Sequence, residues 1–161
     1  MSINEIIFQH KKELVVSLYN IDIRRFSARR QNMEYQRDEH RMHFVAYHIV
    51  WCPRRRKPVL IGDIAKDLRK LIETKCDDNG WEILDLKIAP EHVHLFVRVF
   101  PTTPALFVVN QCKGASSGIL RSKYPDLMKI PSLWTSSYLA STENSVPQEL
   151  IQKFIEIQKG I

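Results

Sequence analysis

Long apolar runs are missing from this sequence. No stretch approaches the roughly 20 consecutive apolar residues that a helix needs to cross a bilayer. The first five residues also lack the basic segment and the long apolar segment that together make a signal peptide. These absences predict a cytoplasmic protein with no membrane partner.

Cysteine is scarce and unpaired in the sequence. The three cysteines are Cys52, Cys76 and Cys112, and no two of them form a C-x-x-C pair. The spacing indicates neither a disulfide framework nor a cysteine zinc site. We expect free thiols that are buried or half-buried.

The balance of charge is basic, with a formal net charge of +6 over 161 residues and a pI of about 9.3. Such a balance favours a polyanionic partner. The basic residues gather at 24–30 and most tightly at 54–57. Each run is equally compatible with a solvated surface.

The chain divides near residue 40. Apolar residues at helical spacing predict an amphipathic helix over 3–19, and residues 20–40 are polar and charged. We therefore predict an N-terminal extension at 1–40 and one folded domain at 41–161, a length that can bury an ordinary core.

Within the folded domain, apolar periodicity and turn residues predict an alternation of strands and helices. Strands are expected at 42–52, 81–89, 92–100 and 133–141. The first helix is expected from about residue 60 to Asn79-Gly80. The second helix is expected to begin after Thr103, its N-cap, and to run to about residue 122. The last helix is expected to begin at a capping-box pattern at 145–148 and to run to about residue 159. The order β-α-β-β-α-β plus a helix predicts an α+β, ferredoxin-like (RRM-like) sandwich with an antiparallel sheet.

The most informative triplet is His92-Val93-His94, inside the third predicted strand. Alternate residues of a strand share a face, so the two imidazoles lie about 7 Å apart on one side while Val93 faces the other. Two such imidazoles can chelate a divalent ion. The pattern is also common among half-exposed structural histidines.

A third ligand is available from the last helix. Gln158 lies four residues after Phe154, so both share one helix face. Glu156 is a less well-placed carboxylate on the same helix. Imidazole and oxygen ligands together suit Mg²⁺ or Mn²⁺, and also allow zinc.

Five segments in order resemble the HUH single-tyrosine transposases of the insertion-sequence two-hundred/six-oh-five family (TnpA-like). They are YHIVWC with RRKPVL, PEHVHL, KGASS, LWTSSY and FIEIQ, and the resemblance covers about residues 40–160. It implies a DNA transposase that binds single-stranded hairpin ends of an insertion sequence as a homodimer. It also implies metal-assisted strand cleavage and transfer through a 5′-phosphotyrosine, with His92, His94 and Gln158 as the metal ligands.

The sequence departs from the family at residue 154, where the resemblance places the catalytic tyrosine. Phe154 has no oxygen and cannot attack phosphorus. The resemblance therefore predicts a chain that binds DNA and metal without cleaving. Tyr138 and Tyr124 are the nearest substitutes, although Tyr138 lies in a predicted strand.

Predicted DNA contacts are basic and hydroxyl side chains of the first basic loop and the second helix: Arg54, Arg55, Arg56, Lys57, Lys113, Ser116, Ser117 and Arg121. Trp51, Trp81 and Trp134 could stack on unpaired bases or pack in the core. Two other functions stay open: a non-enzymatic RNA- or DNA-binding module of this fold, and a metal-dependent phosphodiesterase that activates water.

Overall fold

The computed structural model describes residues 36–38, 41–142 and 145–161. The chain divides into two units, Met1–Met42 and His43–Ile161. The helix predicted over 3–19 lies outside the described residues. The strands β1 (Gln36–Asp38) and β2 (Arg41–His43) pair as a two-stranded sheet.

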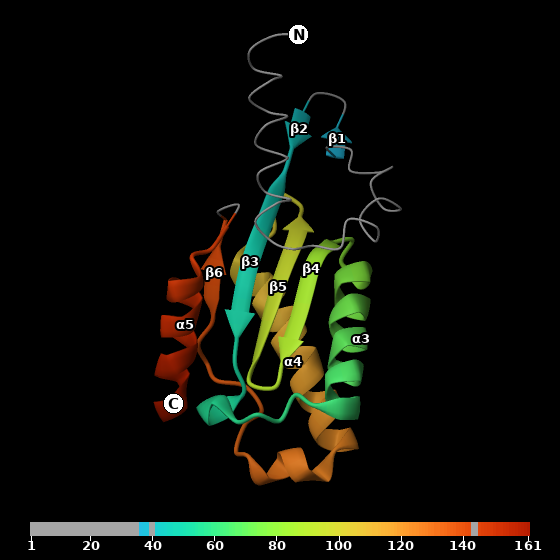
Figure 1. Ribbon diagram of the computed structural model, residues 1–161. Coiled ribbons are helices and arrows are strands. Elements are labelled where there is room, and N and C mark those ends of the chain that lie inside the picture. Colours follow the sequence, from blue (N-terminus) through green and yellow to red (C-terminus); the bar gives the residue numbers. More distant parts are fainter. Residues whose placement is uncertain (1–35, 39–40, 143–144) are drawn as a thin grey trace. The chain divides into compact units, whose positions relative to one another are not determined.

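The larger unit is built on a four-stranded sheet. Its strands are β3 (Val45–Trp51), β4 (Glu82–Ala89), β5 (His92–Val99) and β6 (Leu139–Ser141), in the spatial order β4-β5-β3-β6. Every pairing is antiparallel. This is the α+β, ferredoxin-like arrangement that the sequence predicts, and it is visible in Figure 1.

Two long helices cover one face of the sheet. They are α3 (Gly62–Asp78) and α4 (Ala105–Lys123), and Figure 1 shows α4 behind the strands. Val93, Leu95 and Val97 are fully buried in the core cluster that these helices share with the sheet. The period-2 alternation in β5 thus assigns one side of the strand to the core and the other to the two histidines.

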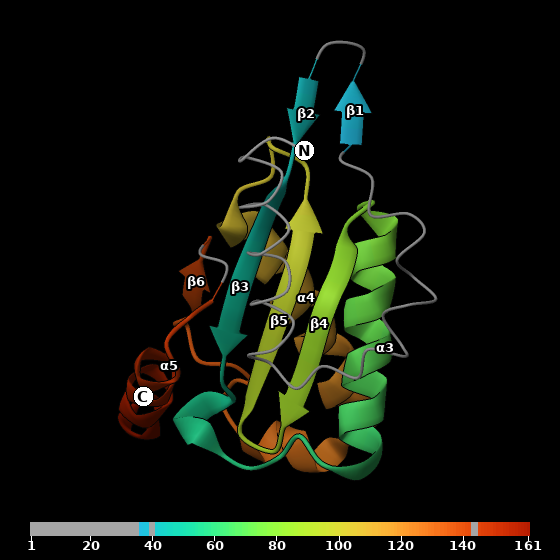
Figure 2. The ribbon, with the colours of Figure 1, turned by 45° about the horizontal axis from the view of Figure 1, so that its top comes forward.

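The last helix, α5 (Gln148–Ile157), continues into a 3₁₀ turn, η4 (Gln158–Gly160). Its buried residues Ile151 and Ile155 form a second cluster with Val50 and Cys52, to which Phe154 and Leu139 add. Figure 1 shows α5 beside β6, and in Figure 2 α5 lies below β6 at the same edge of the sheet. Because Val50 pairs with His94 across β3 and β5, α5 packs on the same face of the sheet as the histidines.

Three local predictions are wrong. The fourth strand is only Leu139–Ser141, since Trp134 makes just an isolated bridge with Pro53. Neither Thr103 nor the 145–148 pattern caps a helix, because Pro104 and Pro147 occupy the N-cap positions without any side-chain cap bond. A proline ring presets the extended backbone at these positions.

Three 3₁₀ turns complete the described elements. η2 (Arg54–Arg56) follows β3, and η3 (Pro125–Lys129) follows α4, while η4 ends the chain. The backbone N–H of Arg55 donates to the carbonyl of Ile161 at 2.8 Å, so η2 is joined to the residue that follows η4. This bond holds the basic loop against the end of α5. No described helix is long and apolar enough to cross a membrane.

Candidate metal centre and nucleic-acid interface

His92 and His94 project from the same face of the sheet, and this is the face on which α5 packs. Both are half-buried, whereas Val93 between them is fully buried in the opposite core. The Nδ1 atom of His92 is buried and has no hydrogen-bond partner among the described residues. A buried imidazole nitrogen without a partner costs free energy unless a ligand occupies it, so this atom fits a metal ligand.

The environment favours the neutral form of both imidazoles. Burial lowers the pKa of His94 to about 4, and the nearby His48 lowers it further in the same direction. Burial also lowers the pKa of His92, against the opposing charge of Glu91. A neutral imidazole has the lone pair that metal coordination requires.

Gln158 is almost fully buried, with 2% of its surface exposed. Its Nε2 donates to the backbone carbonyl of Phe154 at 3.2 Å, and its Oε1 is buried without a hydrogen-bond partner in the described part of the chain. An amide oxygen left in this state is a hard donor suited to a divalent ion. Glu156 on the same helix is exposed.

Two imidazoles and one amide oxygen are a donor set that could hold a divalent ion. Among the described residues no group of three or more His, Cys, Asp or Glu side chains could hold a metal. The amide of Gln158 is therefore essential to the proposed ligand set.

Sequence reasoning missed one residue of this face. His48 in β3 is 4% exposed, and its Nδ1 lies 3.1 Å from Nε2 of His94. The ring of His48 also stacks on Phe96, with centroids 3.9 Å apart and planes 6° apart. The register of β3 against β5 brings these rings together, and that register is not readable from either strand alone.

The tyrosines of the described residues lie away from this site. Tyr47, Tyr124 and Tyr138 pack against the core cluster on the α3 and α4 side of the sheet. The hydroxyl of Tyr47 donates to the Thr103 carbonyl at 2.9 Å, and that of Tyr124 donates to Asp67 at 2.6 Å. Neither predicted substitute is therefore on the histidine face. Phe154 is half-buried beside Val50 and Cys52.

The predicted DNA contacts fall into two groups, on η2 with the residue after it and on α4. Arg55 and Lys57 are exposed, and Arg56 pairs with Glu91 at 2.7 Å. The backbone of Arg55 and Arg56 is left-handed, with φ of 55° and 51°. The arginine run is thus a tight turn, in which Arg54 bonds Ser132 and Arg56 pairs with Glu91, rather than one continuous basic stripe.

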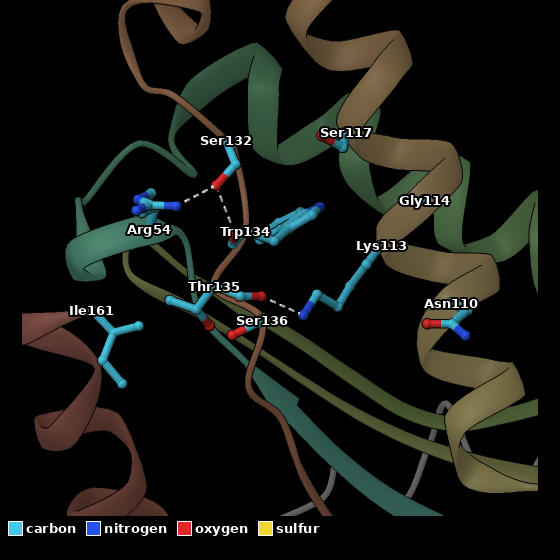
Figure 3. A pocket seen from close by; sticks show the side chains of 10 residues that line it. All are labelled: Arg54, Asn110, Lys113, Gly114, Ser117, Ser132, Trp134, Thr135, Ser136 and Ile161. Atoms are coloured by element: carbon cyan, nitrogen blue, oxygen red, sulfur yellow. Dashed lines mark hydrogen bonds between the residues drawn. The ribbon is translucent and has the colours of Figure 1, made fainter.

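Three of these predicted contacts line one pocket of about 550 Å³: Arg54, Lys113 and Ser117. Figure 3 shows Arg54 bonded to Ser132, and Lys113 reaching across to Thr135. Asn110, also on α4, joins Lys113 and Ser117 there, because residues three, four and seven apart share a helix face. That spacing could have revealed Asn110 from the sequence.

Lys113 links α4 to the segment that contains Thr135 and Ser137. Its Nζ donates to the carbonyls of Thr135 at 2.5 Å and Ser137 at 3.3 Å, and burial lowers its pKa. Ser116 is fully buried, donates to the Cys112 carbonyl and accepts from Nε1 of Trp134. Arg121 donates to the Ile130 carbonyl at 3.1 Å. Ser116 has no surface to offer a phosphate, so we leave it out of the proposed interface.

The three tryptophans are buried in the core cluster, with exposed fractions of 0% for Trp51, 4% for Trp81 and 5% for Trp134. This confirms core packing over base stacking. The three cysteines are buried free thiols, as predicted.

Residues 40–158 match the family model described as "Transposase IS200 like". The chain is 33% identical over 115 residues to the ISDra2 transposase TnpA of Deinococcus radiodurans. This match covers 70% of this chain and 82% of that protein. It is 23% identical over 99 residues to the transposase for insertion sequence element IS200 of Salmonella typhimurium, covering 60% of this chain and 65% of the relative.

A crystal structure of a protein from Deinococcus radiodurans, described as a transposase, superposes with a TM-score of 0.68 and 28% identity. The match covers 76% of this chain and 97% of the solved one. Together with the family match over 40–158, this agreement leads to one conclusion: the chain belongs to the IS200-like transposase family.

Proposed function

We propose that this chain binds single-stranded DNA at the hairpin ends of an insertion sequence, together with Mg²⁺ or Mn²⁺, and does not cleave it. One observation carries the proposal: residue 154, which the resemblance aligns with the family's nucleophile, is a half-buried phenylalanine on α5, four residues before Gln158. Phenylalanine keeps the shape of tyrosine and removes only the attacking oxygen.

The positions of the remaining tyrosines support the loss of cleavage. In the described ranges their hydroxyls are bound to Thr103 and Asp67, or their rings pack on the α3 and α4 side. In-line attack requires the nucleophile within about 3.5 Å of a phosphorus atom held at the histidine face. No described tyrosine is on that face.

His92, His94 and Gln158 hold the divalent ion in this proposal. The unpartnered buried atoms of His92 and Gln158 and the lowered pKa values of both histidines support this assignment. An ion held by these residues would attract and polarise a phosphate oxygen of the bound DNA. The binding function keeps this electrostatic anchor even without a nucleophile.

Arg54, Arg55, Lys57 and the pocket side of α4 form the proposed DNA interface. Cations at these positions neutralise phosphates, while hydroxyl and amide groups such as Ser117 and Asn110 orient the strand. Release of counterions makes such binding steeply dependent on salt. We also propose that the chain acts as a homodimer, as the resemblance implies.

A non-enzymatic nucleic-acid-binding module is the second candidate. Phe154 favours it, because a chain without a nucleophile retains only recognition. The two readings differ in ligand: a transposase-derived chain prefers single-stranded DNA hairpins and divalent metal, whereas an RNA module prefers RNA and ignores metal.

The test is fluorescence anisotropy with a DNA hairpin bearing a single-stranded flank, an unstructured strand of equal length and the matching RNA hairpin. Each is titrated with and without Mn²⁺ at several salt concentrations. We expect preference for the DNA hairpin, enhancement by Mn²⁺, and a shallower salt slope for Arg54→Ala. Lys66→Ala, which removes an exposed cation of α3, is the matched control. Preference for RNA with no effect of Mn²⁺ would contradict the proposal.

A further inference from the structure

The face of the sheet that carries His92 and His94 holds a third imidazole. His48 is on β3 and pairs with Phe96 on β5. Val50, the next residue of β3 on the same face of the sheet, pairs with His94. His48 is therefore a diagonal neighbour of His94 on the same side of the sheet. The Nδ1 of His48 and the Nε2 of His94 are 3.1 Å apart.

Two neutral imidazole nitrogens at this distance must share one proton. If both carried hydrogen they would repel, and if neither did, two lone pairs would face each other. The contact therefore permits two arrangements. Either Nε2–H of His94 donates to His48, or Nδ1–H of His48 donates to His94. In the first arrangement the free lone pair of His94 is on Nδ1. In the second arrangement Nε2 of His94 accepts the hydrogen bond from His48, so the proton of His94 is on Nδ1 and neither nitrogen has a free lone pair.

We infer that His48 is a positioning residue for His94: its Nδ1 accepts the Nε2–H of His94 and thereby leaves the Nδ1 lone pair of His94 for the divalent ion. This inference rests on the proposed function, because only metal ligation requires that lone pair. A ligating histidine usually gives its other N–H to a partner that fixes the tautomer and ring orientation.

The surroundings of His48 suit this role. The ring is 4% exposed, and its face lies parallel to Phe96 at 3.9 Å. Packing on a neighbouring ring fixes the plane of His48, so the direction of its Nδ1 is fixed as well. An imidazole held in this way can orient the ring of His94 that it contacts.

The first test uses the unaltered chain without metal. Long-range ¹H–¹⁵N correlation spectra of the histidine rings report which nitrogen of His94 carries the proton. We expect protonation on Nε2, and protonation on Nδ1 would overturn the inference. Zn²⁺ is then added as a diamagnetic probe. A ligation shift is expected at Nδ1 of His94 and none at His48, whereas a ligation shift at His48 would make it a ligand instead of a positioning residue.

The second test compares Mn²⁺ affinities of His48→Phe and His48→Asn. Phenylalanine keeps a ring beside Phe96 and removes the acceptor, so we expect a loss of about 10- to 100-fold. Asparagine returns an acceptor oxygen near the Nδ1 position and should recover most of the affinity. His43→Phe is the matched control, five residues along the chain from His48. Unchanged affinity in His48→Phe would overturn the inference.

Different outcomes contradict the proposed metal site and the proposed role of His48. If the unaltered chain does not bind Mn²⁺ at all, the metal part of the proposed function is contradicted. If it binds Mn²⁺ while His94 is protonated on Nδ1, the role of His48 alone is wrong.

Discussion

Gln158 and Phe154 are joined across one turn of helix: Nε2 of Gln158 donates to the backbone carbonyl of Phe154 at 3.2 Å. The bond fixes the amide so that Oε1 remains buried without a partner among the described residues. The bond joins the proposed metal ligand to the proposed nucleophile position through the backbone, so it does not depend on the side chain at 154.

Replacement of Gln158 tests the ligand assignment. We expect Gln158→Ala to lower Mn²⁺ affinity at least 10-fold, because one oxygen donor is lost. Glu156→Ala is the control, since Glu156 is exposed on the same helix. Isothermal titration calorimetry measures both. If Glu156→Ala weakens binding more than Gln158→Ala does, the carboxylate is the ligand and our assignment is wrong.

Replacement of Lys113 tests its structural role. Lys113→Met leaves the carbonyls of Thr135 and Ser137 without their donor, and we expect the free energy of unfolding to fall by about 1–3 kcal/mol. Lys70→Met, on the exposed side of α3, should change it by less than about 0.5 kcal/mol. Urea unfolding followed by circular dichroism gives both values. Equal stability of Lys113→Met and the unaltered chain would show that Lys113 is free for DNA.

The thiol of Cys52 reports on the docking of α5. Burial raises the pKa of Cys52 from 9.0 to about 11. Because the raised value favours the neutral thiol in the folded state, its contribution to stability is complete below pH 9 and is lost as the pH rises through 11. We expect negligible alkylation of Cys52 by iodoacetamide at pH 8.5 in the folded chain, measured by peptide mass spectrometry.

Disruption of the α5 cluster supplies the comparison. Ile155→Ala removes a buried contact next to Cys52 and should raise the alkylation rate of Cys52 relative to Cys76 and Cys112, which lie in the other cluster. Equal increases at all three cysteines would mean global unfolding. Rapid alkylation of Cys52 in the unaltered chain would contradict the packing of α5 described above.

Much of the fold is predictable because its signals are local. The alternation of Val93, Leu95 and Val97 fixes the buried face of β5, and the Asn79-Gly80 pair marks the end of α3. The fourth strand is shorter than predicted because Trp134 turns into the core, where its Nε1 bonds Ser116. A long-range contact of this kind leaves no trace in the periodicity of residues 133–138.

The site is predictable to a lesser degree. Spacing alone places His92 with His94 and Phe154 with Gln158. The approach of His48 to His94 depends on the register between β3 and β5, and the carbonyl partners of Lys113 depend on the path of residues 132–138. Both contacts arise from tertiary packing, so they cannot be predicted from the spacing of residues in a single sequence.

The proposed function holds that this chain lacks only the nucleophile. The direct measurement incubates the unaltered chain and Phe154→Tyr with Mn²⁺ and a labelled single-stranded DNA hairpin from the element's own ends, and denaturing gels then reveal covalent protein–DNA adducts. Phe154→Tyr combined with His92→Ala is the control for metal dependence. We predict an adduct with Phe154→Tyr alone. An adduct with the unaltered chain, or none with Phe154→Tyr despite tight binding, would contradict the account.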